Sequence, residues 1–98
     1  MASDKSFHLE VVTPEEAVFK GEVVSVTAPG EEGSFQVLHS HAPLLAALSR
    51  GHLKILLPDG TKTFFHIGGG FFEVSHNNAI LLAESIDPEQ EPASMATP

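Results

Sequence analysis

Alternation of apolar and polar side chains in short segments is the feature that most constrains the fold of this chain. Phe7, Leu9 and Val11 occupy every second position of the first such segment, with His8 and Glu10 between them. The same period recurs over residues 23–28, 35–37, 53–57, 61–67, 71–75 and 79–85. Because successive side chains of a β-strand point to opposite faces of a sheet, this period predicts strands with one buried face. Turn signals recur about every 8–12 residues, a spacing typical of a sandwich or a barrel.

The size and charge of the chain limit what it can bind. Its 98 residues suffice for one domain, and none of them is a cysteine that could form a disulfide. A domain of this size buries only about 60% of its unfolded surface, so a permanent partner would add burial that the chain lacks. Thirteen acidic residues against five basic ones give a net charge of −8, which argues against nucleic acid and against anionic lipid as partners. We expect the basic residues to be scattered; they are Lys5, Lys20, Arg50, Lys54 and Lys62.

The two ends of the chain carry no membrane signal. No apolar run approaches the about 20 residues that a membrane-spanning helix needs, and residues 1–5 do not resemble a signal peptide, so we expect no direct membrane insertion.

From Asp87 to Pro98 the chain has three prolines, three acids and one large apolar residue. Such a segment buries too little to offset the entropy lost on ordering. We therefore expect a folded domain over residues 1–86 and a disordered acidic tail over residues 87–98.

The segment Glu31–Leu45 contains a compact His-Ser-His-Ala-Pro turn that permits two interpretations. One is a metal site, because Gly33, His39 and His41 have the spacing that opens the cupin metal motif. On a strand the two imidazoles would share one face and could reach one transition-metal ion. The full cupin pattern needs a glutamate four or five residues further on. The residues at and around that position are apolar; they are Leu45, Ala46 and Ala47. A cupin-like metal-binding domain that uses His39 and His41 remains the alternative interpretation.

Motifs for nucleotide binding and covalent catalysis are missing from the sequence. Gly68–Gly70 precede a strand pattern with no lysine nearby, so they predict a bulge or a close backbone approach and not a phosphate loop. Neither Ser34 nor Ser40 lies in a Gly-x-Ser-x-Gly elbow, and there is no thiol nucleophile. Glu31 and Glu32 are adjacent on an expected loop, where both would be solvated and could not divide acid and base roles. The sequence thus predicts no catalytic, metal-binding or cofactor-binding residues.

Several short motifs follow one another between Phe7 and Ser85, and their order and spacing are more specific than any one of them. They are Phe19-x-Gly21, Gly33-x-Phe35-x-Val37, His41-Ala42-Pro43-Leu44 and Gly69-Gly70-Phe71-x-Glu73-Val74. Together they resemble the N-terminal domain of the epsilon subunit of F-type ATP synthase, which is called delta in mitochondria. Gln36 departs from the family, which usually has glycine at that position. The family also usually continues into two C-terminal helices, whereas this chain ends in its acidic, proline-rich segment.

The resemblance implies an all-β fold, a small two-sheet β-sandwich of about ten short strands. It implies a non-catalytic rotor subunit of the central stalk, with the gamma subunit and the c-ring as partners, which couples proton translocation to ATP synthesis. Such a subunit needs no cofactor and lies peripheral to the inner (plasma) membrane on the cytoplasmic side. If this sequence is the complete natural subunit, we expect it to couple rotation without acting as an extending brake on ATP hydrolysis. The candidate interface with the c-ring and the stalk consists of Glu31, Glu32, Ser34, His39, Ser40, His41, Ala42, Pro43 and Leu44.

Overall fold

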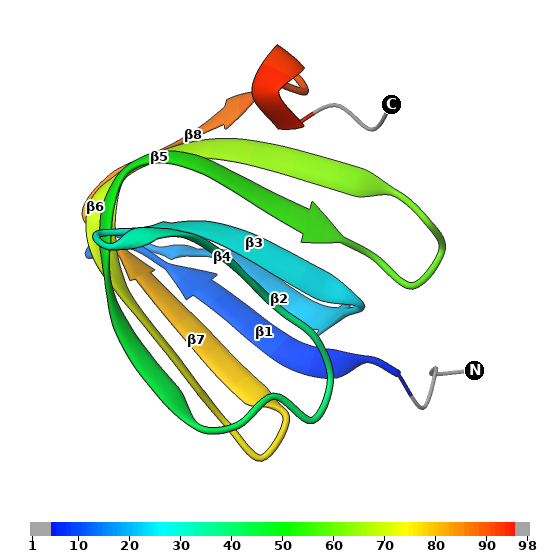
Figure 1. Ribbon diagram of the computed structural model, residues 1–98. Helices are drawn as coiled ribbons and strands as arrows, with labels where there is room; N and C mark the ends of the chain where they lie inside the picture. Colours follow the sequence, from blue (N-terminus) through cyan, green and yellow to red (C-terminus); the bar gives the residue numbers. More distant parts are fainter. Residues whose placement is uncertain (1–4, 96–98) are drawn as a thin grey trace.

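The computed structural model describes residues 5–95, which form eight β-strands and one short 3-10 helix (Figure 1). The elements are β1 (Phe7–Val12), β2 (Ala17–Val23), β3 (Ser25–Gly30), β4 (Gly33–Val37), β5 (Leu44–Leu56), β6 (Lys62–Ser75), β7 (Asn78–Ala83), β8 (Ile86–Glu89) and the 3-10 helix η1 (Ala93–Met95). In β1, Phe7, Leu9 and Val11 are buried while His8 and Glu10 stay partly exposed. The alternation in the sequence is therefore the alternation between the core and the surface.

The strands form one hydrogen-bonded sheet that folds over on itself. Its order is β2-β1-β7-β6-β5-β3-β4, and β8 pairs with β6 outside this path. The first part of β5 and the last part of β6 share a layer with β7, β1 and β2, whereas their other parts pair with β3 and β8. Figure 1 shows β5 and β6 curving from one layer into the other. The predicted all-β sandwich is confirmed. The expected number of about ten short strands was too high for residues 5–95, because β5 and β6 are 13 and 14 residues long and serve both layers.

The glycine triplet Gly68–Gly70 lies where β6 turns the corner of the sandwich. Gly69 and Gly70 have φ angles of 115° and 148°, which residues with a side chain rarely adopt. A Cβ atom at Gly70 would also overlap the carbonyl oxygen of Leu82 on the neighbouring β7. The triplet thus permits the close backbone approach that the sequence predicts.

The side chains that face the core change phase at this corner. Phe65 and Ile67 point inward before the glycines, whereas Phe72 and Val74 point inward after them. The ring of Phe72 packs edge-on against Phe35, with ring centroids 5.6 Å apart. Burying one large apolar side chain contributes about 1.5–3 kcal/mol. The two layers enclose one apolar cluster; its buried members are Phe7, Leu9, Val11, Val23, Val26, Ala28, Val37, Leu48, Leu53, Ile55, Phe65, Ile67, Phe72, Val74, Ala79, Leu81 and Ala83.

The start of the tail that composition predicts to be disordered, residues 87–98, is ordered in the structure. Ile86–Glu89 form β8, which pairs antiparallel with Phe64–Ile67 of β6, and Ile86 packs against the core. Pairing with β6 orders this short strand. Strand formation depends on such tertiary contacts more than on the intrinsic propensity of the residues, so composition alone does not predict it. Residues 96–98 of the predicted tail lie outside the described residues. No helix within residues 5–95 is long and apolar enough to cross a bilayer.

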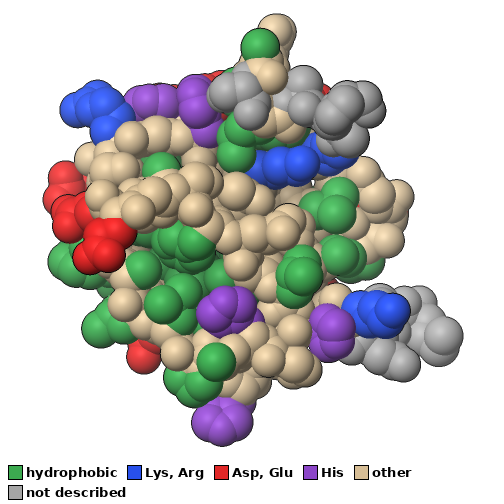
Figure 2. Space-filling view, viewed as in Figure 1, with side chains coloured by type: hydrophobic (Ala, Val, Ile, Leu, Met, Phe, Trp, Pro, Cys, Tyr) green, Lys and Arg blue, Asp and Glu red, His purple; other side chains and the backbone are tan. Residues whose placement is uncertain are grey.

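Basic side chains gather more closely than their spacing in the sequence predicts. Arg50, His52 and Lys54 alternate along β5 and so share its outer face, and Lys62 lies on the same face of β6. Figure 2 shows Lys, Arg and His side chains along the top of the molecule. Glu89 of β8 lies among them, with its Oε2 atom 2.7 Å from Nδ1 of His52. The face therefore has mixed charge, and the expectation of scattered basic residues was wrong here.

Candidate functional site

The β3–β4 hairpin ends in a tight tip, Glu31–Glu32. Gly30 pairs with Gly33, whose φ of 126° favours glycine, and a Cβ atom at Gly30 would lie only 2.7 Å from the carbonyl oxygen of Gly33. The backbone N–H of Glu31 donates a hydrogen bond of 3.0 Å to the carbonyl of Ala47, which fixes the tip against β5. Both glutamate side chains are exposed. The hairpin thus presents two adjacent carboxylates on a fixed backbone.

A groove of about 570 Å³ separates this tip from the start of β5. It is lined by Gly30, Glu31, Glu32, Gly33, Ser34, Phe35, His41, Leu44, Leu45, Ala46 and Ala47. One wall is polar, since it includes Glu31, Glu32 and Ser34, and the other is the apolar start of β5. Such a groove suits a partner segment with both polar and apolar side chains.

The loop between β4 and β5 spans residues 38–43. Its residue Ser40 has a positive φ of 61°, and its N–H donates a hydrogen bond of 2.6 Å to Oδ1 of Asn77. Nδ1 of His41 lies 2.7 Å from the carbonyl oxygen of Ala42, so the imidazole ties the turn before Pro43 together. A hollow of about 300 Å³ lies between this loop and the β6–β7 turn; Ser40, His41, Ala42, Pro43, His76 and Asn77 line it.

The structure divides the residues expected at the interface between these two hollows. Glu31, Glu32, Ser34 and Leu44 line the groove, while Ser40, Ala42 and Pro43 line the hollow and His41 lines both. His39 lies in the turn between them and lines neither.

The geometry assumed for the metal interpretation was wrong. β4 ends at Val37, so His39 and His41 lie in a turn and a loop and not side by side on one strand. Among residues 5–95, no group of three or more His, Asp or Glu side chains is arranged to hold a metal ion. The two histidines are therefore better understood as parts of the loop.

An apolar surface that sequence reasoning missed lies on the outer face of the other layer. Cross-strand pairing places Val12, Leu82, Phe71 and Ala47 side by side across β1, β7, β6 and β5. The exposed fractions of Phe71, Leu82 and Leu45 are 56%, 47% and 72%. We call Val12, Leu45, Ala47, Phe71 and Leu82 the apolar row. Figure 2 shows apolar side chains gathered beside acidic ones on the left of the view.

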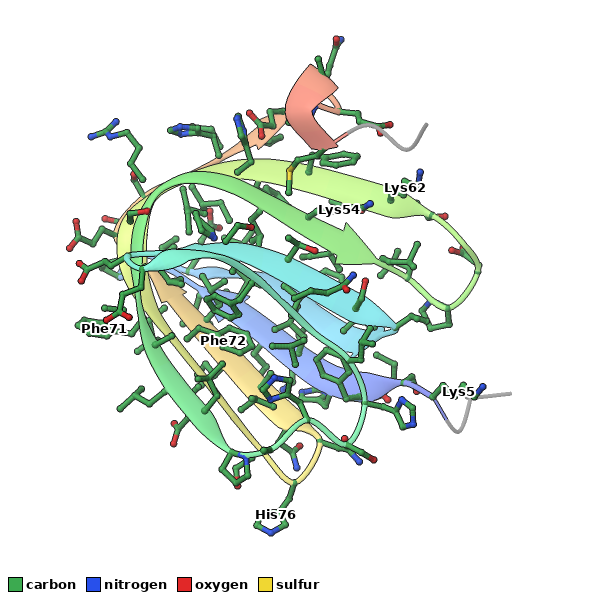
Figure 3. All side chains as sticks on the ribbon, viewed as in Figure 1. Lys5, Lys54, Lys62, Phe71, Phe72 and His76 are labelled. Atoms are coloured by element: carbon green, nitrogen blue, oxygen red, sulfur yellow. The ribbon has the colours of Figure 1, made fainter. Side chains whose placement is uncertain are left out.

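The sequence does hold a signal for the apolar row. In a strand, only one of two adjacent large side chains can face the core, so Phe71 and Phe72 could not both be buried. Figure 3 shows Phe71 pointing outward and Phe72 pointing between the layers. Glu10 of β1 and Glu73 of β6 lie on the same face as the apolar row, each two positions from its member on that strand. Glu73 is also the cross-strand partner of Leu45. The apolar row therefore has an acidic border.

Comparison with known proteins places the chain in a family. The family model described as the ATP synthase delta/epsilon chain β-sandwich domain matches residues 6–89. The chain is 54% identical over 85 residues to the ATP synthase epsilon chain of Chlorobium limicola and 55% identical to that of Chlorobaculum tepidum. Each match covers 87% of this chain and 97% of the relative. A match to the epsilon chain of Nitratiruptor, at 51% identity, covers 62% of that longer relative.

Solved structures share the fold at low sequence identity. A chain of the mitochondrial ATP synthase of Euglena gracilis superposes with a TM-score of 0.82 at 22% identity, and a chain of the Tetrahymena thermophila enzyme's central stalk and c-ring with a TM-score of 0.70 at 20% identity. This chain spans 56% and 64% of the lengths of those two chains. With the family model matched over nearly the whole described sandwich, the chain belongs to the ATP synthase delta/epsilon β-sandwich family.

Proposed function

We propose that this chain is a non-catalytic subunit in the central stalk of an F-type ATP synthase, where it joins the gamma subunit to the c-ring. Membership of the family supports a place in that complex. The observation that carries the proposed role is the apolar row, an exposed apolar patch on a chain with a net charge of −8. Soluble proteins rarely expose contiguous apolar side chains without a partner for them. Coupling of proton translocation to ATP synthesis, at the surface of the inner (plasma) membrane on the cytoplasmic side, follows from this role.

The apolar row is the face that we assign to the gamma subunit. Permanent interfaces are more apolar than the rest of a protein surface, and aromatic side chains at their centres dominate the affinity. Phe71 lies between Leu82 and Ala47 in the cross-strand row and has the largest side chain of the set. The acidic border formed by Glu10 and Glu73 would complement basic groups on the partner and would orient it.

The Glu31–Glu32 tip, the groove and the loop after β4 are the surface that we assign to the c-ring. These residues include two exposed carboxylates and several hydrogen-bonding groups, so they suit the polar loops of a ring better than an apolar helix. The groups are held on a backbone that glycines and hydrogen bonds fix, and binding residues concentrate on loops of this kind. The stiff two-layer core behind them would transmit torque, because packed interiors compress little.

Substitution of Phe71 tests the assignment of the apolar row. Phe71→Ser should weaken association with the gamma subunit about 30-fold or more, because truncation of an aromatic anchor costs about 2 kcal/mol or more. Leu38→Ser is the matched control, since Leu38 is 48% exposed and lies outside the apolar row. Affinity can be measured by titrating each folded variant into a gamma-containing catalytic head. Equal affinities for the two variants would refute this face as the gamma contact.

Charge reversal tests the assignment of the tip. Glu31→Lys with Glu32→Lys should lower ATP-driven proton pumping in reconstituted vesicles more than it lowers ATP hydrolysis. The control is Glu15→Lys with Glu16→Lys, an exposed pair in the loop before β2. Because surface substitutions usually change stability by within about 0.5 kcal/mol, both double variants should fold. Pumping and hydrolysis that both stay at the level of the unsubstituted protein would exclude the tip from the ring contact.

A further inference from the structure

The β6–β7 turn has asparagine at a position where its backbone conformation favours glycine. His76 and Asn77 connect the paired residues Ser75 and Asn78, and their φ angles are 51° and 62°. Two consecutive positive φ angles define a type I′ hairpin turn, whose preferred second residue is glycine. Asparagine tolerates this conformation, but glycine would adopt it with less strain. The backbone of the turn alone therefore does not explain the side chain at position 77.

The side chain of Asn77 reaches a loop that is 37 residues away in the sequence. Its Oδ1 atom accepts the N–H of Ser40 at 2.6 Å, while its backbone carbonyl accepts the N–H of His8 at 3.0 Å. Asn77 thus joins the β4–β5 loop, the β6–β7 turn and the start of β1. Figure 3 shows the turn, marked by His76, projecting from the lower end of the sandwich.

Ser40 is the residue of the loop that most needs such support. Its φ of 61° lies in the left-handed region, which a residue with a Cβ atom adopts only when its surroundings hold it there. Ser40 is exposed, so packing against the core does not hold it. The hydrogen bond from its N–H to Asn77 is the contact that favours this conformation. Ser40 directly precedes His41, Ala42 and Pro43, so its conformation sets the direction of the chain through these residues.

We infer that Asn77 is a positioning residue, which clamps the loop of residues 38–43 to the β6–β7 turn and makes the two one rigid surface. The inference rests on the proposed function in one respect, namely that this loop meets a partner. The hollow of about 300 Å³ between the two loops is the concave part of that surface. His76 and Asn77 therefore extend the candidate interface beyond the residues that sequence motifs point to.

The test separates the clamp from the turn by replacing Asn77 in two ways. Asn77→Gly removes the amide and leaves a residue that suits the turn, whereas Asn77→Asp keeps an acceptor oxygen in place. His76→Gly is the matched control, because it introduces glycine at the other turn position and leaves Asn77 intact. Hydrogen exchange of the Ser40 amide, measured by NMR in the full chain, reports the clamp directly. Asn77→Gly should raise the exchange rate about two- to tenfold, the factor that corresponds to one net hydrogen bond, while the other two variants should not.

A second measurement keeps the clamp and the proposed function distinguishable. In the assembled ATP synthase, Asn77→Gly should speed dissociation of this subunit by a similar factor, and Asn77→Asp, which keeps the acceptor oxygen, should have a smaller effect. Unchanged exchange of the Ser40 amide in Asn77→Gly would overturn the inference, whatever the dissociation rate. Faster exchange with an unchanged dissociation rate would uphold the clamp and would refute the loop as a partner contact.

Discussion

Phe71 and Phe72 are adjacent in the sequence, yet the structure predicts that truncation of Phe72 destabilises the chain and truncation of Phe71 does not. Phe72 is fully buried and packs edge-on against Phe35, so Phe72→Ala leaves a cavity and breaks an aromatic pair. Such truncations cost about 3–5 kcal/mol, a large share of the roughly 5–15 kcal/mol that stabilises a domain of this size. With about 4–8 °C lost per kcal/mol, Phe72→Ala should lower the melting temperature by about 12 °C or more.

Phe71→Ala should leave the isolated chain nearly as stable as the unsubstituted protein. Its side chain is 56% exposed, and surface substitutions usually stay within about 0.5 kcal/mol, or less than about 4 °C. Thermal unfolding followed by circular dichroism at one protein concentration compares the two variants, with denaturant unfolding as a check on two-state behaviour. A similar loss of stability in both would mean that the phase change at Gly68–Gly70 is absent, and the reasoning about the apolar row would fail with it.

Other predictions follow from single contacts. Gly70→Ala should destabilise the chain by more than about 3 kcal/mol in urea unfolding, because it adds a positive-φ penalty to an overlap with backbone; a loss below about 1 kcal/mol would contradict the close approach. The pKa of Asp59 is lowered, first by a backbone hydrogen bond and then by a side-chain hydrogen bond from Thr61. The contribution of Asp59 to stability is therefore present above its unfolded pKa of about 3.9 and is lost as the pH falls through its lower folded pKa. Urea unfolding of Asp59→Asn should accordingly differ from the unsubstituted protein between pH 5 and 7. The two should converge as the pH falls through the lowered pKa of Asp59, and a difference that persists at the acid limit would contradict this assignment. Ending the chain after Glu89 should change the melting temperature little, whereas ending it after Ser85 removes β8 and should lower it by about 5 °C or more.

The sequence predicts this fold well where local pattern and tertiary context agree. In β1 the alternation of Phe7, Leu9 and Val11 is also the burial pattern, because the strand is central and has one core-facing side. The turn at Pro58–Gly60 forms as its residues predict, with Asp59 accepting the N–H of Thr61 at 2.8 Å. In both cases the deciding interactions lie within a few residues of one another.

Sequence reasoning failed where distant segments decide the outcome. In the sequence, the glycine triplet separates the alternating segments 61–67 and 71–75, but in the structure β6 runs through it as one strand. β8 contains Pro88 and two acids, and its order comes from β6, which lies about 20 residues away in the chain. The clamp between Ser40 and Asn77 spans 37 residues and belongs to no motif. Of the candidate interface, the tip and the loop were foreseeable as turns, and the Phe71–Phe72 pair signals one outward aromatic ring. The extent of the apolar row and the contact of Asn77 needed the three-dimensional register.

Amide hydrogen exchange of this chain, free and within an assembled F-type ATP synthase, tests the proposed role most directly. We predict new protection around Leu45–Ala47, Phe71 and Leu82, together with the Glu31–Glu32 tip, and none on the outer face of β5 around His52. Exchange is suited to this comparison because buried interfaces slow amide opening locally. Failure of the chain to enter the complex, or protection confined to the face around His52, would contradict the account.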